Sequence, residues 1–591
     1  MNPTDPSSST PQGPPATKNL DEAASSAAGT APSKAWDPFT NRLFRALWTA
    51  SLVSSLGTWV QQIANGWLMT SLTPQPLLVS MVEVCNALPM FLLALPAGAL
   101  ADVVDRRRYL LATQCWMMVV ALLMGVLTMT DLITPGRLLA GTFVMSLGVA
   151  MNSPGWHSVT PEIVSREQLA GAIALNGLSI NGAKAVGPAL GGLILLWFGP
   201  AAAFFLNALS FSAVISVLLV WKRRNLPVNV PPERFVSALK VGVRHVRYSA
   251  RLRAALSRST TFLLSSTALW ALLPLLLSKS YGLGPQGYGV MVACFGMGAV
   301  TGTVVLLPRI RQRHSINAIV TGGWLTFAVS LIGLATLDGG PAAGLAMFLG
   351  GASWLCIMAQ LHLVVQSSAP RWVQARAMSV YLLCFFGAAC VGSLLWGLVA
   401  QHFGVREALA MASLTLFVTS LSGFWSPLRS SESFNLEPSH AWPEPEVAIG
   451  PPADHGPVLV TVEYQIDPKD ASAFRQAAET LRAFRYQNGA VQWGIFVDIA
   501  DPTKYREVYM EEDWGSHLRQ HERVTAYETE VASGVYAFHR GHGMPPVIHY
   551  AYCGRGFPTG TERPIPKVYR TTSRGVPLWF VDDLVGDADD A

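Results

Sequence analysis

The stretch Gly98-Ala99-Leu100-Ala101-Asp102-Val103-Val104-Asp105-Arg106-Arg107-Arg108 closes a long apolar run and opens a short, strongly basic connection to the next run. Three consecutive arginines at the end of a hydrophobic span are typical of the cytoplasmic side of a membrane. Gly98 permits close approach of a neighbouring helix, and Asp102 lies one turn later on the same helix face. The stretch therefore predicts a connection between two membrane helices, serving either as a gate or only as a topogenic signal.

Composition indicates a membrane protein. The 591 residues are 51% hydrophobic and only 13% charged, against about 25% charged residues in soluble domains. A bilayer crossing needs about 20 mostly apolar residues, so the apolar runs between Leu43 and Leu428 hold about twelve spans. The net charge of +5 comes with arginines in membrane-flanking loops, so we expect no nucleic-acid partner. The seven cysteines show no paired spacing, which argues against a disulfide framework or a cysteine metal site.

The chain divides into two helical halves and a C-terminal α+β unit. The predicted divisions are a disordered tail over 1–38, a first six-helix half over 39–221, a basic connector over 222–257, a second six-helix half over 258–429, a proline-rich linker over 430–456, an α+β domain over 457–541 and an irregular tail over 542–591. The spans are predicted near 43–71, 78–100, 109–130, 137–154, 172–197 and 201–221, and near 258–280, 288–308, 316–337, 341–366, 376–400 and 406–428.

Basic residues fall almost entirely on one set of alternate loops. The other set carries only Arg137, Lys279 and Arg406. By the positive-inside rule both termini of this multi-pass protein are cytoplasmic.

An internal repeat relates the two halves. Gly187, Gly192 and Phe198-Gly199 recur as Gly392, Gly397 and Phe403-Gly404, all at an offset of 205 residues. Both copies lie on an odd-numbered span and the turn after it, so the halves have the same orientation. This predicts parallel halves related by an axis along the membrane normal.

Polar residues inside spans are candidates for the transport path, because a charge there costs several kcal/mol unless it faces protein or water. Gln62 and Asn65 share one face of the first span and either line a polar cavity or form interhelical hydrogen bonds. Glu83 and Asn86 form an i,i+3 pair, in which Glu83 either carries a proton or lies in water at the outer mouth. Weaker cavity candidates are Trp270, Gln360 and His362.

The fifth span contains Lys184 one turn before Gly187-Pro188-Ala189-Leu190-Gly191-Gly192. Small residues allow tight helix packing, and Pro188 loosens the backbone hydrogen bonds beneath it. Lys184 either attracts an anionic substrate, pairs with a carboxylate, or extends to the cytoplasmic face.

These motifs resemble the major facilitator superfamily. The stretch from Gly98 to Arg106 is similar to its loop between helices 2 and 3, Gly-x-x-x-Asp-(Arg/Lys)-x-Gly-(Arg/Lys), with Asp105 in place of the second Gly. In that family the acidic residue latches helix ends together on the cytoplasmic side. The resemblance implies a gating motif of Gly98, Asp102, Asp105, Arg106 and Arg107.

The resemblance narrows to one branch over roughly 40–430. Gly187-Pro188-x-x-Gly191-Gly192 resembles the antiporter signature, and the first span contains Leu-Gly-Thr-Trp-Val-Gln-Gln. The combination resembles the enterobactin exporter and its relatives, the transmembrane secretion effectors. It implies proton-coupled export of a small amphipathic or anionic molecule, siderophore-like or drug-like. Glu83 and Asp102 are the candidates for proton coupling. No cofactor is expected. The resemblance also implies that the membrane is the inner membrane of a bacterium.

The segment from Val458 alternates like a strand and begins a β-α-β-β-α-β pattern, with a second helix near Trp514 and a last strand over 535–538. This order predicts a ferredoxin-like domain. It resembles the dimeric α+β barrel family that includes antibiotic-biosynthesis monooxygenases. We expect self-association or docking through an open sheet face bearing Val460, Val462 and Tyr464.

Two points bear on chemistry in this domain. His517 and His521 form an i,i+4 pair that suits a metal, but no third ligand is evident, so no metal site is predicted. No oxygenase residue set carries over, and a fold alone does not justify an activity. We therefore expect a dimerisation or sensing module rather than an enzyme; the alternative is a bifunctional protein that modifies the compound before export.

Overall fold

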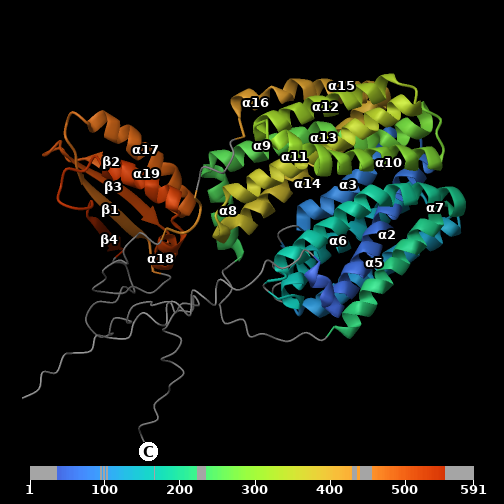
Figure 1. Ribbon diagram of the computed structural model, residues 1–591, viewed down its shortest axis with the longest axis horizontal. Coiled ribbons are helices and arrows are strands. Elements are labelled where there is room, and N and C mark those ends of the chain that lie inside the picture. The colour runs from blue at the N-terminus through green and yellow to red at the C-terminus, as the bar shows by residue number, and fades with distance from the viewer. Residues whose placement is uncertain are drawn as a thin grey trace, which may run out of the picture.

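The computed structural model describes residues 36–93, 96–97, 100, 104–165, 167–221, 235–428, 435–439 and 455–552. Gly98 and Asp102 of the predicted gating motif, the tail up to residue 35 and the residues after 552 lie outside this set. A large helical bundle and a smaller α+β domain form two distinct parts of the chain, with helix α8 on the side of the bundle nearest the domain (Figure 1).

The first half of the bundle consists of long helices with ordinary capping signals. Asn41 accepts hydrogen bonds from the backbone N–H groups of Leu43 and Phe44, which satisfies two of the free donors at a helix start. The elements are η1 (Asp37–Thr40), α2 (Arg42–Leu72), α3 (Pro76–Leu93), α5 (Arg106–Met129), α6 (Pro135–Ile163) and α7 (Leu169–Val220). Gly199 interrupts α7 with a φ of 75°, a conformation that favours glycine, so α7 comprises two helical parts.

The second half follows a separate amphipathic helix, α8 (Phe235–Tyr248). Its elements are α9 (Ala250–Leu275), η2 (Leu276–Ser280), α10 (Pro285–Thr301), η3 (Gly302–Leu306), α11 (Leu307–Arg311), α12 (Ile316–Thr336), α13 (Gly340–Ser368), α14 (Arg371–Phe403), α15 (Val405–Ser420) and α16 (Ser422–Trp425). Within the described residues, nine helices are long and apolar enough to cross a membrane.

The sequence repeat corresponds to a repeat in packing. A Cβ on Gly187 would lie 2.5 Å from Cβ of Trp59 in α2, and one on Gly392 would lie 2.6 Å from the carbonyl oxygen of Leu264 in α9. Trp59 and Leu264 are themselves 205 residues apart. Gly404, like Gly199, has a positive φ, of 103°. The repeated glycines therefore make the same helix contact in each half.

The second glycine of each pair lies where the halves meet. A Cβ on Gly192 of α7 would lie 2.5 Å from Cα of Gly289 in α10, and one on Gly397 of α14 would collide with the Ser80 hydroxyl in α3. The two halves thus pack α7 against α10 and α3 against α14.

The C-terminal domain is built on a four-stranded antiparallel sheet in the order β2-β3-β1-β4. Its elements are β1 (Val458–Gln465), α17 (Ala471–Asn488), β2 (Gln492–Val497), β3 (Lys504–Glu511), α18 (Trp514–Arg523), α19 (Ala526–Tyr536) and β4 (Val547–Ala551).

Two expectations for this domain are wrong. Residues 535–538 form the end of helix α19, which stops at Tyr536, and the turn after it instead of the last strand, because a capping box of Thr525 and Glu528 starts a helix that runs into them. The last strand, β4, lies beyond the predicted domain end at 541, in the segment expected to be irregular.

The expected open face of the sheet is also misassigned. Val460, Val462 and Tyr464 are at most 2% exposed and pack in the core under the helices. The opposite face carries Phe496, which is 59% exposed, and Tyr550, which is 48% exposed. The apolar alternation was read correctly, but it marks the covered face.

Candidate transport site and gates

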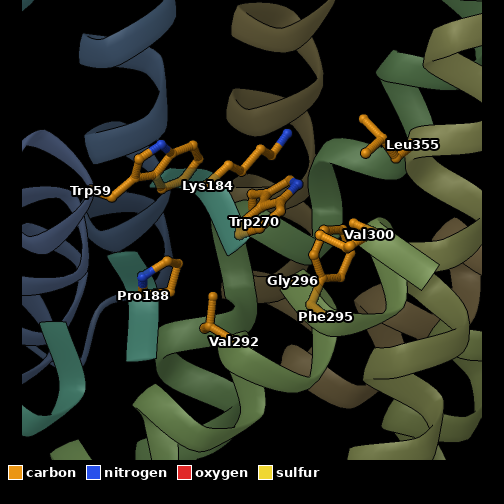
Figure 2. Close-up of a pocket in the computed structure, with 10 residues that line it drawn as sticks. Trp59, Lys184, Pro188, Trp270, Val292, Phe295, Gly296, Val300 and Leu355 are labelled. Carbon is orange, nitrogen blue, oxygen red and sulfur yellow. The ribbon is translucent and has the colours of Figure 1, made fainter. Parts of the chain in front are cut away.

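A small pocket lies where helices of both halves meet. Its central charged group is Lys184 of α7, flanked by Trp59 of α2 and Trp270 of α9 (Figure 2). The Lys184 Nζ lies 5.8 Å from the centroid of the Trp59 ring, within reach of a cation–π interaction. The lining residues are Trp59, Lys184, Pro188, Trp270, Val292, Phe295, Gly296, Ala299, Val300 and Leu355.

Small residues of α7 bring Lys184 to this place. Gly187 lies against Trp59, and a Cβ on Gly191 would lie 3.1 Å from Cβ of Ile63, also in α2. Close approach of two backbones needs such residues. Pro188 lines the pocket one turn after Lys184. The Gly-Pro segment therefore fixes the position of the cation against the aromatic wall.

Lys184 has no acidic partner among the residues that the structure describes. The candidate carboxylate Glu83 of α3 lies instead beside Asn86, whose Nδ2 is 3.5 Å from Glu83 Oε2. The Asn86 Oδ1 accepts a hydrogen bond of 3.3 Å from Ser146 of α6. Lys184 and Glu83 therefore lie among different neighbouring residues.

The amide pair of the first span differs from the expected cavity lining. Gln61, not Gln62, makes the strong interhelical contact: Asn207 of α7 donates to its Oε1 at 2.6 Å, and both residues are buried. Asn65 is buried as well, and its Oδ1 has no hydrogen-bond partner in the described part of the chain. Gln61 was missed because its polar partner, Asn207, is visible only as an isolated amide in a distant apolar run.

The second-half candidates fall into different surroundings. Trp270 lines the pocket, with its ring 4.8 Å from that of Phe295. The His362 ring lies 4.9 Å from the ring of Tyr381 in α14. Gln360 is buried, and its Oε1 has no hydrogen-bond partner within the described ranges.

The basic stretch ties three helix ends together. Asp105 caps α5 by accepting a hydrogen bond of 2.9 Å from the backbone N–H of Arg108. Arg106 forms an ion pair with Glu162 near the end of α6. Arg107 donates to the carbonyl oxygens of Leu218 (2.8 Å) and Leu219 (2.7 Å) at the end of α7. Glu162 was missed from sequence because its partner is 56 residues away.

The C-terminal domain contains one buried ion pair. Arg485 of α17 donates to both oxygens of Glu507 in β3, at 2.9 and 3.2 Å. Trp493 and Tyr464 donate to the same carboxylate. Burial acts to raise the pKa of Glu507, but the ion pair and the hydrogen bonds outweigh it and hold that pKa below its ordinary value. With four donors around one carboxylate, the group is structural.

The bundle of membrane-length helices in two repeated halves, with a charged and aromatic pocket where they meet, has the fold of solved transporter structures. The family model and the relatives identify the chain as a multi-pass membrane transporter of the major facilitator superfamily. The chain belongs to the transmembrane secretion effector family, whose model matches residues 33–555. The family and the curated relatives are transporters, not enzymes.

Relatives and solved structures agree with this assignment. The staphyloferrin A transporter of Staphylococcus aureus is 22% identical over 380 residues, covering 64% of this chain and 94% of its own. The multidrug efflux pump Tap of Mycobacterium tuberculosis is 24% identical over 397 residues, covering 63% and 90%. The crystal structure of a point mutant of the nucleoside transporter NupG matches with a TM-score of 0.54 at 12% identity, covering 65% of this chain and all of that one. A bacterial homologue of the lysosomal transporter Spinster, in an inward-facing unoccupied conformation, matches with a TM-score of 0.53 at 10% identity, covering 65% and 96%.

Proposed function

We propose that the protein exports a small amphipathic molecule with a negative charge, siderophore-like or drug-like, by proton-coupled alternating access. The observation that carries the proposal is Lys184 in a pocket whose walls come from both halves. Transport needs a site that both halves can close upon in turn, and this pocket has that position.

The pocket chemistry supports the substrate class. An unpaired cation inside a membrane protein is costly unless it serves a ligand or a pathway. Trp59, Trp270 and Phe295 surround it with aromatic surface, which suits the apolar body of an amphipathic anion. The staphyloferrin A transporter supports transport of a small molecule, and the multidrug efflux pump Tap supports the outward direction.

The proposed topology has twelve spans. In addition to α7 and the eight other apolar helices, α2 and α6 have membrane length, and the break at Gly199 divides α7 into two crossings. Nearly all loop arginines fall on one set of alternate loops in the sequence, and in this topology those loops form one end of the bundle, which we call the basic end; it includes Arg106 and Arg107. The positive-inside rule places this end and both termini in the cytoplasm of a bacterial cell.

Proton coupling is assigned to Glu83, with Asp102 as the second candidate. Glu83 is half-buried in α3, and its link through Asn86 to Ser146 joins α3 to α6. Protonation would change the charge at a junction between two helices, which is the kind of local event that biases a conformational equilibrium.

The test measures efflux of fluorescent dyes from energised cells. One dye is an amphipathic anion and the other is a cation of similar size. Lys184→Gln should abolish selective efflux of the anion, whereas Lys279→Gln, the same change at an exposed site outside the pocket, should leave it intact. Glu83→Gln should remove the dependence of efflux on the pH gradient while binding of the anion persists. Equal anion efflux by the wild type and Lys184→Gln would contradict the proposal.

We further infer that the C-terminal domain has a ferredoxin-like fold and acts as a docking or self-association module. The strand order and the helices on one face support the fold. Exposed Phe496 and Tyr550 on the other face support pairing with a second copy, since exposed apolar patches usually mark interfaces. The Glu507 carboxylate, which already accepts four hydrogen bonds, gives no support to a monooxygenase activity.

A further inference from the structure

Three histidines converge in the C-terminal domain. His517 and His521 lie one turn apart on α18, and His549 comes from β4. One ligand atom from each of the three lies within 4.8 Å of the others. The Nε2 atoms of His517 and His521 are 3.2 Å apart. The sequence alone did not identify His549 as a third ligand, because β4 lies in a segment that was expected to be irregular.

A buried carboxylate stands behind the first of these rings. Oε2 of Glu511, at the end of β3, lies 3.3 Å from Nδ1 of His517. The His517 side chain is fully buried, and that of Glu511 is 1% exposed. The contact is not aligned as a hydrogen bond, but it places the carboxylate beside one ring nitrogen and leaves the other nitrogen to bind a metal. A carboxylate in this place behind the ring is usual for metal-ligating histidines.

The cluster has unmet bonding capacity. Both oxygens of Glu511, Nδ1 of His517 and Nε2 of His549 are buried and make no hydrogen bond with any described residue. Buried polar atoms are nearly always paired in native proteins, so several together need an explanation. Packing between aromatic rings does not explain these atoms. The Trp514 ring is tilted against the His517 ring, with centroids 5.3 Å apart, and it makes no hydrogen bond with any of them.

We propose that His517, His521 and His549 bind one divalent first-row transition-metal ion, best matched by Zn²⁺, with Glu511 orienting His517. Imidazole nitrogens at about 2.0–2.1 Å from a tetrahedral Zn²⁺ lie roughly 3.4 Å from one another, close to the spacing of the His517 and His521 pair. A side-chain rotation of His549 completes the set. Three protein ligands leave a fourth position for water or another small ligand.

The proposed site connects to the bundle through α18. Arg523, at the end of this helix, lies over the Trp372 ring of α14, with its guanidinium carbon 4.3 Å from the ring centroid. A metal held by α18 and β4 would fix the last strand of the sheet to the helix that touches the transporter. The site thus suits a structural or sensing ion.

The test uses the full-length chain in detergent, purified with a tag that contains no histidine and stripped of metal with a chelator. Titration with Co²⁺, followed by its visible absorption and by elemental analysis, should show one tetrahedral ion per chain that Zn²⁺ displaces. His521→Ala and His549→Ala should lower the affinity by at least about tenfold, and Glu511→Gln by about 10–100-fold. His542→Ala, at an exposed position of the same domain, is the matched control and should bind like the wild type.

Two outcomes would overturn the proposal: no stoichiometric Co²⁺ binding by the wild type, or unchanged binding by His549→Ala. X-ray absorption of the Zn²⁺-loaded wild-type chain provides a check that needs no variant. Three imidazole nitrogens around the ion would support the site, and a shell of oxygen ligands alone would contradict it.

Discussion

At the scale of single residues, Glu507 and Glu528 of the C-terminal domain are buried in different ways. Glu507 receives an ion pair and two further hydrogen bonds, so its charged form is compensated. Glu528 of α19 is 7% exposed and receives hydrogen bonds on one oxygen from Asn488 (2.9 Å) and the backbone N–H of Thr525 (3.2 Å). Burial therefore raises the pKa of Glu528 from 4.5 to about 7, against the opposing effect of those bonds.

This difference predicts a pH-dependent stability. Because the folded chain binds the Glu528 proton more tightly than the unfolded chain, the free energy of unfolding falls as pH rises from about 4.5 to about 7, by roughly 3 kcal/mol in total. Glu528→Gln should therefore raise the urea midpoint of the domain at pH 8 and change it little at pH 5. Pulse proteolysis of the full-length chain measures this midpoint. Glu479→Gln on the exposed face of α17 is the control, and an equal effect of Glu528→Gln at both pH values would refute the argument.

At the scale of elements, local signals predicted the helices well and missed what depends on distant partners. The repeat of Gly187 and Gly392 could be read because glycine spacing records helix contacts in both halves. Glu162 could not be assigned, since its role comes from Arg106 in another helix. Strand β4 could not be predicted because its five residues, which follow glycines and prolines, show little periodicity. His549 could not be placed for the same reason.

The contact of α7 with α10 gives a prediction about transport. A Cβ on Gly192 would lie 2.5 Å from Cα of Gly289, so Gly192→Leu should prevent the approach of the two halves seen here. Moving two packed backbones apart costs free energy, so we expect efflux to fall by about tenfold or more. The amount of folded protein should stay measurable. Gly182→Leu, on the same helix with open space around its Cβ, is the control. Dye efflux and size-exclusion profiles measure both effects; normal efflux by Gly192→Leu would show that this contact is not needed in the cycle.

At the scale of the whole molecule, α8 links the C-terminal domain to the bundle. Arg244 of α8 forms an ion pair of 2.7 Å with Glu512 and donates to the carbonyl oxygen of Gly489. The Tyr248 and Tyr486 rings stack with centroids 4.5 Å apart. Helix α8 also packs against α14 and α9 of the second half, so movement of that half would reach the domain through this helix. These three contacts on α8, together with Arg523 on Trp372, define one docked arrangement.

The docking contact can be tested by reversing its charges. Arg244→Glu sets two carboxylates against each other and removes the donor to Gly489, so the domain should separate from α8. Docking is measured as disulfide formation between Tyr248→Cys and Tyr486→Cys, read after cleavage at a protease site inserted within 440–454. The yield should drop several-fold with Arg244→Glu and recover in part when Glu512→Arg is added, because the swapped pair restores the attraction but not the carbonyl contact. Glu479→Arg, an equal change of charge on the exposed face of α17, should leave the yield unchanged. If Arg244→Glu cross-links as well as the parent double-cysteine chain, contacts other than the ion pair and the tyrosine stack, such as Arg523 on Trp372, hold the domain, and the charge of Arg244 has no part in docking.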